Sequence, residues 1–406
     1  MLEALFLVLR LDKRGAEKPD IEKKHYIYKV TDSHSDWVQL VKGPSEVYVE
    51  GHADVLGKDV FNSQVYVDVG KILPFETSAG CNIQVRGGET WLASARTAGT
   101  TIWQEIIQNI FADRVLRRIL IVGKTDSGKS SLATYIINKA LNLGLKPRLI
   151  DADVGQGDLA PPNAIGAAVI ERQITDIRDV KARFFEFIGS TSPVGFEQII
   201  IKSVKKIFLR IRNQGDICII NTDGYFLDNG VTYKLRLAQE LTPDLVVCLG
   251  QSDVYDIFKA KSFSSMVLHG KSPASDLIKS RIDRNQRRQA QLLRYVSDDY
   301  YNNKLLSKEL KRVNFVYGGI IFPARQIICG SGCLYLIDGN KRVLRWTLTN
   351  MFVGLGFNRN FVGFGVISNA SRRKIYIRSA AAVGNFNEVY LSQSTVDNNR
   401  VHPIPL

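Results

Sequence analysis

The chain has 406 residues, of which 45% are hydrophobic and 23% are charged. These fractions are close to those of globular proteins, so they exclude a collagen, a coiled coil and a wholly disordered chain. The 54 Lys and Arg residues outnumber the 40 Asp and Glu residues, which gives a formal net charge of +14. This excess favours a polyanionic partner, either a nucleic acid or an acidic membrane surface; a generally basic, solvated surface is the alternative.

The cysteines and the N-terminal segment indicate the setting of the protein. Five cysteines, spread from Cys81 to Cys333, do not form the framework of a small secreted domain. Cys329 and Cys333 lie close together, but no second pair or nearby His completes a zinc site, so we expect structural thiols. The apolar run from Ala4 to Leu9 lacks the features of a signal peptide and predicts a strand. With no membrane-length apolar window, we expect a soluble, cytoplasmic protein, or a nuclear one in a eukaryote.

The first domain that the sequence predicts is a small β-sandwich or barrel over residues 1–98. Short β-branched runs at 47–49, 65–69 and 82–85 are separated by turn residues such as Gly43-Pro44 and Gly87-Gly88. Residues 101–116 then carry apolar side chains at helical spacing and predict a helix.

An α/β domain is predicted over residues 99–311. The continuous apolar run at 119–122 is typical of a strand buried on both faces, and further strand-like segments follow at 148–151, 216–220 and 244–249. Helical segments lie between them, such as 130–143, and this alternation favours a parallel, doubly wound sheet. Strand-like runs return at 375–377 and 389–391, so we expect a β domain over residues 312–406. The predicted fold is an α/β core with an all-β domain on each side.

One segment of the α/β domain fits the phosphate-binding pattern G-x-x-x-x-G-K-[ST] and makes the predicted core a P-loop NTPase. It is Gly123-Lys124-Thr125-Asp126-Ser127-Gly128-Lys129-Ser130, to which we add Ser131, and it lies between a predicted strand and a predicted helix. Glycines let backbone N–H groups face phosphate oxygens, and the helix N-terminus adds positive potential. We expect Lys129 to reach the β- and γ-phosphates and Ser130 to bind Mg²⁺. An ordinary strand–turn–helix connection is the alternative.

Two acidic sites compete for a role near the γ-phosphate. Asp151 and Asp153 follow one predicted strand, and Asp223 follows another. In a parallel sheet both strand ends lie at the edge that carries the P-loop. A carboxylate there can hold Mg²⁺ or accept the proton of an attacking hydroxyl; a helix N-cap or turn residue is the alternative for each. Two acids shortly before the pair Gly155-Gln156 favour the first site, with Asp151 joining Ser130 at the metal.

Four segments together resemble the polynucleotide 5′-hydroxyl kinases related to mRNA 3′-end cleavage and pre-ribosomal RNA processing factors, in an archaeal-type form. In chain order they are 123–131 (GKTDSGKSS), 151–157 (DADVGQG), 189–193 (GSTSP) and 219–224 (IINTDG). The resemblance also covers 43–81, whereas the final hundred residues match only in being β-like. It implies transfer of the γ-phosphoryl group of ATP to the 5′-hydroxyl end of RNA or DNA. An ATP-binding scaffold without catalysis in an RNA-processing complex is the alternative.

The resemblance also implies roles for individual residues. Asp153 corresponds to the carboxylate that positions and deprotonates the 5′-hydroxyl. Gln156, Thr191 and Ser192 would contact the nucleic acid, since 191–193 resembles a clasp that grips it; a plain turn is the alternative. Tyr225 stands where family members often have a Trp that stacks on the terminal base, and Tyr can also stack. A core or rim aromatic is the alternative for Tyr225.

Two basic segments account for part of the net charge. Residues 279–295 resemble the Arg-rich lid of the family, and the matched pair is Arg284 and Arg288, four apart on one helical face. Their guanidinium groups would neutralise charge on the transferring phosphoryl group, and Arg281 or Lys279 would supply a further cation. The second segment, 202–212, either lines the route of the nucleic acid or forms the solvated face of an amphipathic helix.

Overall fold

The computed structural model describes residues 25–29, 36–112, 116–250, 252–261, 265–273, 280–296, 304–323, 327–330, 333–338, 341–379, 383–397 and 400–403. The apolar run 4–9 and Lys279 lie outside the described residues. The chain forms two compact units, one of Met1–Glu105 with Pro273–Ala290 and one of Ile106–Ser272 with Gln291–Leu406. The three domains with bounds at 98/99 and 311/312 stay a prediction.

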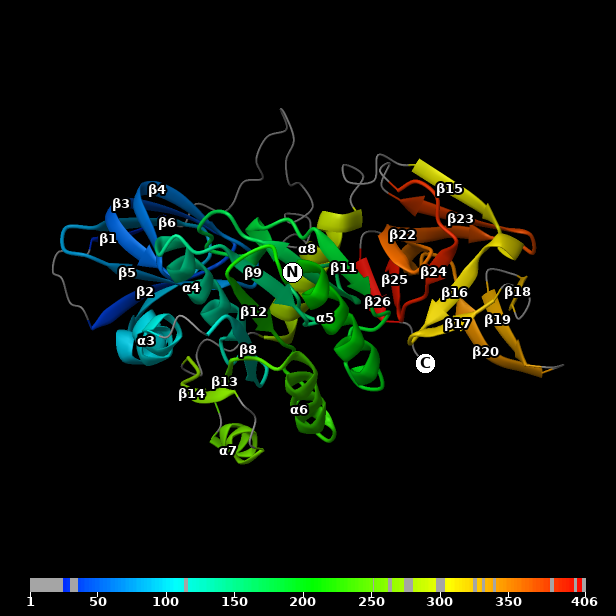
Figure 1. The fold of residues 1–406 in the computed structure, drawn as a ribbon. Helices are drawn as coiled ribbons and strands as arrows, with labels where there is room; N and C mark the ends of the chain where they lie inside the picture. The colour runs from blue at the N-terminus through cyan, green and yellow to red at the C-terminus, as the bar shows by residue number, and fades with distance from the viewer. Residues whose placement is uncertain are drawn as a thin grey trace. The chain divides into compact units, whose positions relative to one another are not determined.

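The N-terminal unit is built on an antiparallel β sheet (blue in Figure 1). Its strands are β1 (His25–Lys29), β2 (Trp37–Lys42), β3 (Ser45–Val55), β4 (Lys58–Val67), β5 (Ile72–Thr77), β6 (Asn82–Arg86) and β7 (Glu89–Ser94). They run in the order β1-β6-β3-β5-β2-β7, and β4 pairs with β3. Val47 and Val49 are buried while Tyr48 between them is exposed, as the alternation of a sheet with one covered face requires.

The helix predicted over 101–116 starts later than expected, because residues 100–103 form a 3₁₀ helix, and residues 113–115 lie outside the described residues. Its parts are α2 (Ala95–Ala98), the 3₁₀ helix η2 (Thr100–Trp103) and α3 (Gln104–Ala112). Ile106 and Ile110 are buried, so the apolar spacing did predict the covered face.

The second unit contains the central sheet, whose order is β11-β10-β9-β12-β8-β13-β14 (Figure 1). The strands are β8 (Arg118–Gly123), β9 (Pro147–Asp151), β10 (Ala164–Val169), β11 (Phe184–Phe187), β12 (Ile217–Asn221), β13 (Leu245–Leu249) and β14 (Met266–Gly270). The predicted parallel sheet is confirmed for β9, β12, β8, β13 and β14. Antiparallel β10 and β11 extend it, and sequence patterns missed them because β10 is a run of Ala and Gly with little strand signal.

Helices cover the central sheet. They are α4 (Lys129–Asn142), α5 (Glu197–Ile211), α6 (Gly230–Leu241) and α7 (Ser252–Ala260), with the 3₁₀ helix η3 (Ile177–Asp179) between β10 and β11. Leu120 and Val122 of β8 share one core with Ile200 of α5 and Leu237 of α6. No side chain of β9, β12 or β13 is exposed, which explains their continuous apolar runs. Within the described residues, no helix is both long and apolar enough to cross a membrane.

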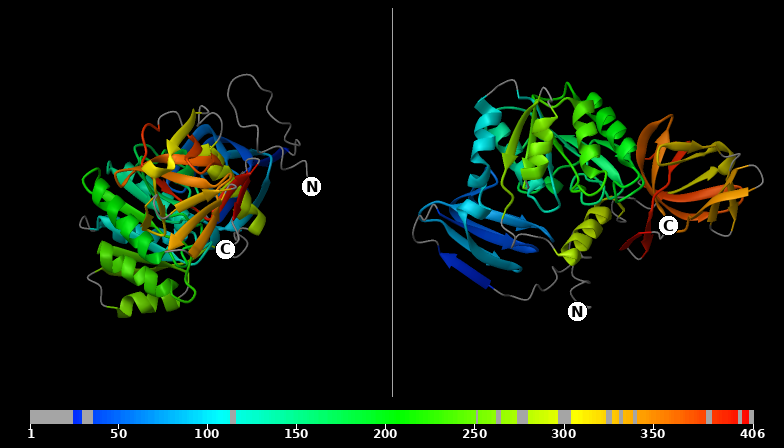
Figure 2. Two further views of the ribbon diagram at one scale, coloured as in Figure 1. Left: turned by 90° about the vertical axis from the view of Figure 1, so that its right-hand side faces the viewer. Right: turned by 90° about the horizontal axis from the view of Figure 1, so that it is seen from below.

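The C-terminal part of the second unit consists mainly of strands (yellow to red in Figure 2). They are β15 (Lys304–Glu309), β16 (Asn314–Tyr317), β17 (Ile320–Phe322), β18 (Ile327–Gly330), β19 (Cys333–Asp338), β20 (Lys341–Thr347), β21 (Phe352–Phe357), β22 (Asn360–Ala370), β23 (Lys374–Ser379), β24 (Glu388–Tyr390), β25 (Ser394–Asp397) and β26 (Arg400–Pro403), with the 3₁₀ helix η5 (Leu310–Arg312). Phe187 of β11 packs among Phe352 and Phe364, so these strands share an aromatic core with the edge of the central sheet.

Candidate functional site

The P-loop follows β8 at the carboxyl edge of the parallel strands, as predicted. A Cβ built on Gly123 would lie 2.5 Å from Ser127 Oγ and 2.7 Å from the carbonyl oxygen of Leu249, so only glycine fits there. Asp126 and Gly128 have φ values of 61° and 89°, which turn the loop sharply into α4. Ser127 Oγ is buried and has no hydrogen-bond partner among the described residues. An orphaned hydroxyl inside such a loop fits a phosphate-binding role.

Lys129 lies in the first turn of α4 and folds back over the loop. Its Nζ donates to the carbonyl oxygens of Gly123 and Lys124 at 2.8 and 2.6 Å. Burial lowers the pKa of Lys129 to about 8, although Asp153 opposes this effect. An ammonium whose partners are loop carbonyl groups can exchange them for phosphate oxygens, and a bound anion would raise the pKa of Lys129 again.

Ser130 and Asp151, predicted together at the metal, are joined by an amide that the sequence reasoning did not include. Asn221 Nδ2 donates to Ser130 Oγ at 3.3 Å and to Asp151 Oδ1 at 3.1 Å. The other oxygen of Asp151 accepts the backbone N–H groups of Asp158 and Leu159. Burial, followed by the charges of Asp158 and Asp153, raises the pKa of Asp151 to about 7. Ser130 therefore offers a ligand atom, while both oxygens of Asp151 already accept protein N–H groups.

Asp153 is arranged differently, with one oxygen held and the other open. Its Oδ1 accepts the backbone N–H groups of Gly155 and Gln156 at 3.0 and 2.8 Å, forming an Asx turn. Its Oδ2 makes no hydrogen bond within the described residues, and the side chain is partly exposed. Burial and then Asp223 raise the pKa of Asp153, while Lys129 lowers it. The turn fixes the carboxylate, and the open oxygen can accept a proton from an incoming hydroxyl.

Asp223, the competing acid, is occupied by structural contacts. Its Oδ2 lies 2.6 Å from Lys234 Nζ and accepts the Tyr233 hydroxyl at 3.1 Å, both from α6. Its Oδ1 accepts the backbone N–H of Tyr225. Lys234 is fully buried, and burial lowers its pKa while Asp223 opposes this. These contacts favour a structural role for Asp223.

This buried pair predicts a large loss of stability in Lys234→Met. Removing the ammonium leaves the Asp223 carboxylate buried with only neutral donors, which should lower the free energy of unfolding by about 3 kcal/mol. Chemical denaturation of the purified protein measures this loss. The matched control is Lys205→Met, because Lys205 Nζ lies 2.7 Å from Glu240 on the exposed surface; it should cost less than about 1 kcal/mol. Equal losses in the two variants would contradict the prediction.

The predicted clasp 191–193 lies beside the Asp153 turn, and together with Gly189 and Ser190 it is called the clasp segment below. A Cβ on Gly155 would come within 2.5 Å of the Thr191 carbonyl oxygen, so the two backbones touch. The Ser192 N–H donates to Ser190 Oγ at 3.0 Å, while Ser192 itself is exposed. Thr191 and Gln156 are partly exposed, so the structure brings three predicted nucleic-acid contacts around Asp153.

Tyr225 follows β12 and is held next to the P-loop. A Cβ on Gly224 would lie 2.4 Å from Thr125 Oγ1, so this segment passes directly over the P-loop. The Tyr225 ring is partly buried against the core that α6 covers. It is thus a rim aromatic with one part of its ring available for stacking.

The predicted lid is the helix α8 (Arg281–Val296). Ser280 and Asp283 exchange hydrogen bonds at its start, each at 3.0 Å, so the only acid of the basic segment caps the helix. Arg284 and Arg288 are one turn apart and partly buried, and they belong to the N-terminal compact unit, whereas the P-loop belongs to the other. Their contact with a phosphoryl group stays a prediction.

The last turns of α8 belong to the second compact unit. Gln291 Nε2 donates to the Asp158 carbonyl oxygen, and the Tyr295 hydroxyl to that of Leu159, both at 2.7 Å. These bonds tie the end of the helix to the segment that follows the Asp153 turn.

The basic residues of α5 are paired with acids more than the sequence indicated. Lys206 lies 2.7 Å and Arg210 3.8 Å from Glu186, and Lys205 pairs with Glu240. The opposite face of α5, including Ile200 and Val204, is buried. These contacts favour the interpretation as an amphipathic helix.

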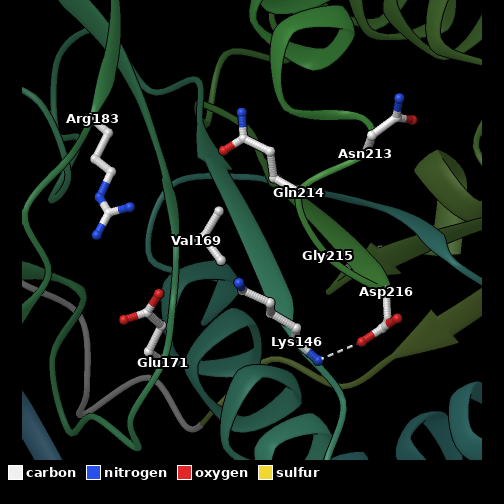
Figure 3. A pocket seen from close by; sticks show the side chains of 8 residues that line it. All are labelled: Lys146, Val169, Glu171, Arg183, Asn213, Gln214, Gly215 and Asp216. Atoms are coloured by element: carbon white, nitrogen blue, oxygen red, sulfur yellow. Dashed lines mark hydrogen bonds between the residues drawn. The ribbon is translucent and has the colours of Figure 1, made fainter.

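A separate pocket of about 440 Å³ lies at the amino ends of the parallel strands of the central sheet, opposite the P-loop (Figure 3). Its charged lining residues are Lys146, Glu171, Arg183 and Asp216, and the Lys146 N–H donates to Asp216 at 2.8 Å. Lys146 and Asp216 precede β9 and β12, whereas the P-loop lies where the parallel strands end. The pocket is therefore not part of the phosphate site.

These features define a P-loop NTPase: a glycine-bounded loop joins a buried parallel strand to a helix that starts at Lys129. Residues 123–298 match the family described as mRNA cleavage and polyadenylation factor CLP1 P-loop. The family predicted from the four motif segments is confirmed.

Two relatives and one solved structure illustrate the similarity. A polyribonucleotide 5′-hydroxyl-kinase of Methanocaldococcus jannaschii is 33% identical over 132 residues, which are 32% of this chain and 37% of that protein. The human polyribonucleotide 5′-hydroxyl-kinase Clp1 is 25% identical over 269 residues, 61% of each chain. A chain of the wild-type Clp1p–Pcf11p complex superposes with a TM-score of 0.67 at 10% identity and covers 93% of this chain and 98% of that one. That likeness concerns the fold alone.

Proposed function

We propose that this protein is an ATP-dependent polynucleotide 5′-hydroxyl kinase. The observation that supports this most is the open Oδ2 of Asp153. Lys129 of the nearby P-loop donates to two carbonyl groups of the loop, which it can exchange for phosphate oxygens. An NTPase whose general base activates only water needs no surface beside that base for a second substrate. Here the backbone of the clasp segment touches the turn that holds Asp153, the proposed base. Named relatives with this activity support the proposal, although the matched segments span only 37% and 61% of their lengths.

On this proposal the donor side of the site is the P-loop. The segment from Gly123 to Ser131 would hold the ATP phosphates through its N–H groups, with Lys129 on the β- and γ-phosphates. Mg²⁺, when bound, would neutralise charge on these phosphates, and Ser130 would be its protein ligand. Asp151 Oδ1, which accepts the Asn221 amide at 3.1 Å, has a second lone pair, and Asp151 would join Ser130 at the metal.

The acceptor side would be the surface around Asp153. Asp153 would orient the 5′-hydroxyl and take its proton as the γ-phosphorus is attacked. Gln156, Thr191 and Ser192 would contact the first nucleotides, and Tyr225 would stack on the terminal base. Arg284 and Arg288 would neutralise the transferring group. The 5′-hydroxyl ends of RNA and of DNA both fit this chemistry. We propose other RNA-processing proteins as partners. We also propose a cytoplasmic location or, in a eukaryote, a nuclear one.

The test is transfer of labelled γ-phosphate from ATP to a 5′-hydroxyl oligonucleotide, with the same oligonucleotide bearing a 5′-phosphate as control. The proposal predicts product only with the 5′-hydroxyl end. ATP binding with no transfer to any RNA or DNA end would refute the kinase and support a scaffold.

The proposal makes a prediction for Tyr225. Base–aromatic stacking contributes about 1–3 kcal/mol, so Tyr225→Leu should weaken binding of a single strand about 5- to 150-fold. Leucine keeps apolar packing against the core, and Tyr225→Trp is the matched control that retains a stacking surface. Fluorescence anisotropy with a labelled oligonucleotide measures the affinities. Equal affinity of the Leu and Trp variants would show that Tyr225 only packs.

A further inference from the structure

The turn between β24 and β25 reaches from the C-terminal strands to the clasp. Gln393 lies in this turn, and its backbone N–H donates to the carbonyl oxygen of Gly189 at 2.8 Å. Gly189 has a φ of 91°, and a Cβ there would lie 2.4 Å from the Leu391 carbonyl oxygen. The turn and the start of the clasp are therefore in direct backbone contact.

The side chain of Gln393 makes a second connection. Ser190 Oγ lies 3.0 Å from Gln393 Oε1 and 2.9 Å from the Ser192 carbonyl oxygen, so it can donate to either. Gln393 Nε2 donates to the Tyr317 hydroxyl at 2.7 Å. Each end of this amide thus has a partner, which fixes its orientation.

Tyr317 adds a contact at the far end of the clasp. Its ring packs edge-on against Phe196, with 5.7 Å between the ring centroids. The Phe196 N–H donates to the Pro193 carbonyl oxygen at 2.8 Å, so Phe196 closes the clasp before α5. The C-terminal strands therefore hold the clasp at both ends.

The other side of the clasp segment faces the turn that holds Asp153, the proposed catalytic base. The Thr191 carbonyl oxygen touches Gly155, whose N–H donates to Asp153 Oδ1. The clasp thus lies between the Asp153 turn and the Gln393 turn, and a displacement on one side must be taken up by the other.

We infer that Gln393 is a positioning residue for the nucleic-acid acceptor: it orients the clasp through Ser190 and Gly189, which gives the C-terminal β strands a role in acceptor binding. This inference rests on the proposed kinase function. Gln393 contacts neither the P-loop nor Asp153 within the described residues, so its effect should be confined to the acceptor.

The test compares wild type with Gln393→Met, which keeps the side-chain length and removes both amide hydrogen bonds. The loss of one or two such bonds should raise the KM for a 5′-hydroxyl oligonucleotide about 3- to 10-fold, with the KM for ATP unchanged. The matched control is Gln198→Met, an exposed glutamine of α5 close to the clasp, which should change neither KM. In Ser190→Ala, adding Gln393→Met should raise the acceptor KM by less than about twofold, because the two residues act through one contact.

A second measurement separates the inference from the kinase proposal. Hydrogen exchange of the peptide 188–195 should be faster in Gln393→Met than in wild type and unchanged in Gln198→Met. If wild type transfers no phosphate, the kinase proposal fails. Faster exchange in Gln393→Met would still show that Gln393 holds the clasp segment in place. Unchanged exchange, or equal rises of both KM values, would overturn the inference.

Discussion

Lys129→Ala is expected to lose phosphoryl transfer by about 10³- to 10⁵-fold, the scale seen when a cation on the transferring phosphoryl group is removed. Among the described residues this buried ammonium donates to two carbonyl groups of the loop, so its removal takes a cation away from the loop that would hold the phosphates. Initial rates with saturating oligonucleotide and varied ATP measure the loss.

The control for this variant is Lys139→Ala, in the last turn of the same helix. Lys139 lies 5.5 Å from the centre of the Tyr135 ring and has no place in the loop, so transfer should stay within about twofold of wild type. Circular dichroism should show that both variants fold. Transfer by Lys129→Ala within tenfold of wild type would remove the P-loop from the reaction.

Asp153→Asn is expected to lower kcat by about 10²- to 10⁴-fold with little change in the KM for ATP. Asparagine keeps the oxygen that accepts the N–H groups of Gly155 and Gln156, so the turn should persist. The open oxygen becomes an amide nitrogen that cannot accept a proton, and the negative charge near Lys129 is lost, while the turn that positions the side chain is kept. Single-turnover measurements report the chemical step directly.

Asp223→Asn is the comparison that decides between the two acids. Because the Asp223 carboxylate neutralises buried Lys234, this variant should lose stability while the folded fraction keeps most of its kcat. If Asp223→Asn abolishes transfer and Asp153→Asn retains it, the roles assigned here are reversed.

The strands of the central sheet could be predicted because burial on both faces leaves a continuous apolar run, as in β8 and β13. The helix α4 could be predicted because the phosphate-binding pattern requires one at that point. Strands β10 and β11 could not, since their pairing is decided by neighbours distant in the chain. The 3₁₀ helix before α3 shows the same limit at the start of a helix.

The candidate site was predictable where function imposes a spacing, as for the P-loop and the acids around Asp153. Asn221, Lys234 and Gln393 were missed because each acts through a partner on another element. Lys234 alone left a trace, because it falls three residues before Leu237 and seven before Leu241, inside the apolar stripe of α6. A lysine within such a stripe needs a buried acid, and Asp223 supplies it.

The contact of Gly224 with Thr125 has a consequence for the site as a whole. The segment that carries Tyr225 meets the loop for the phosphate donor at Gly224, where a Cβ would lie 2.4 Å from Thr125 Oγ1 and 2.5 Å from the Thr125 backbone nitrogen. A substitution that adds a side chain at Gly224 would therefore push the phosphate loop and the Tyr225 segment apart. The donor loop and the aromatic residue on the acceptor side thus depend on one packing contact that only glycine permits.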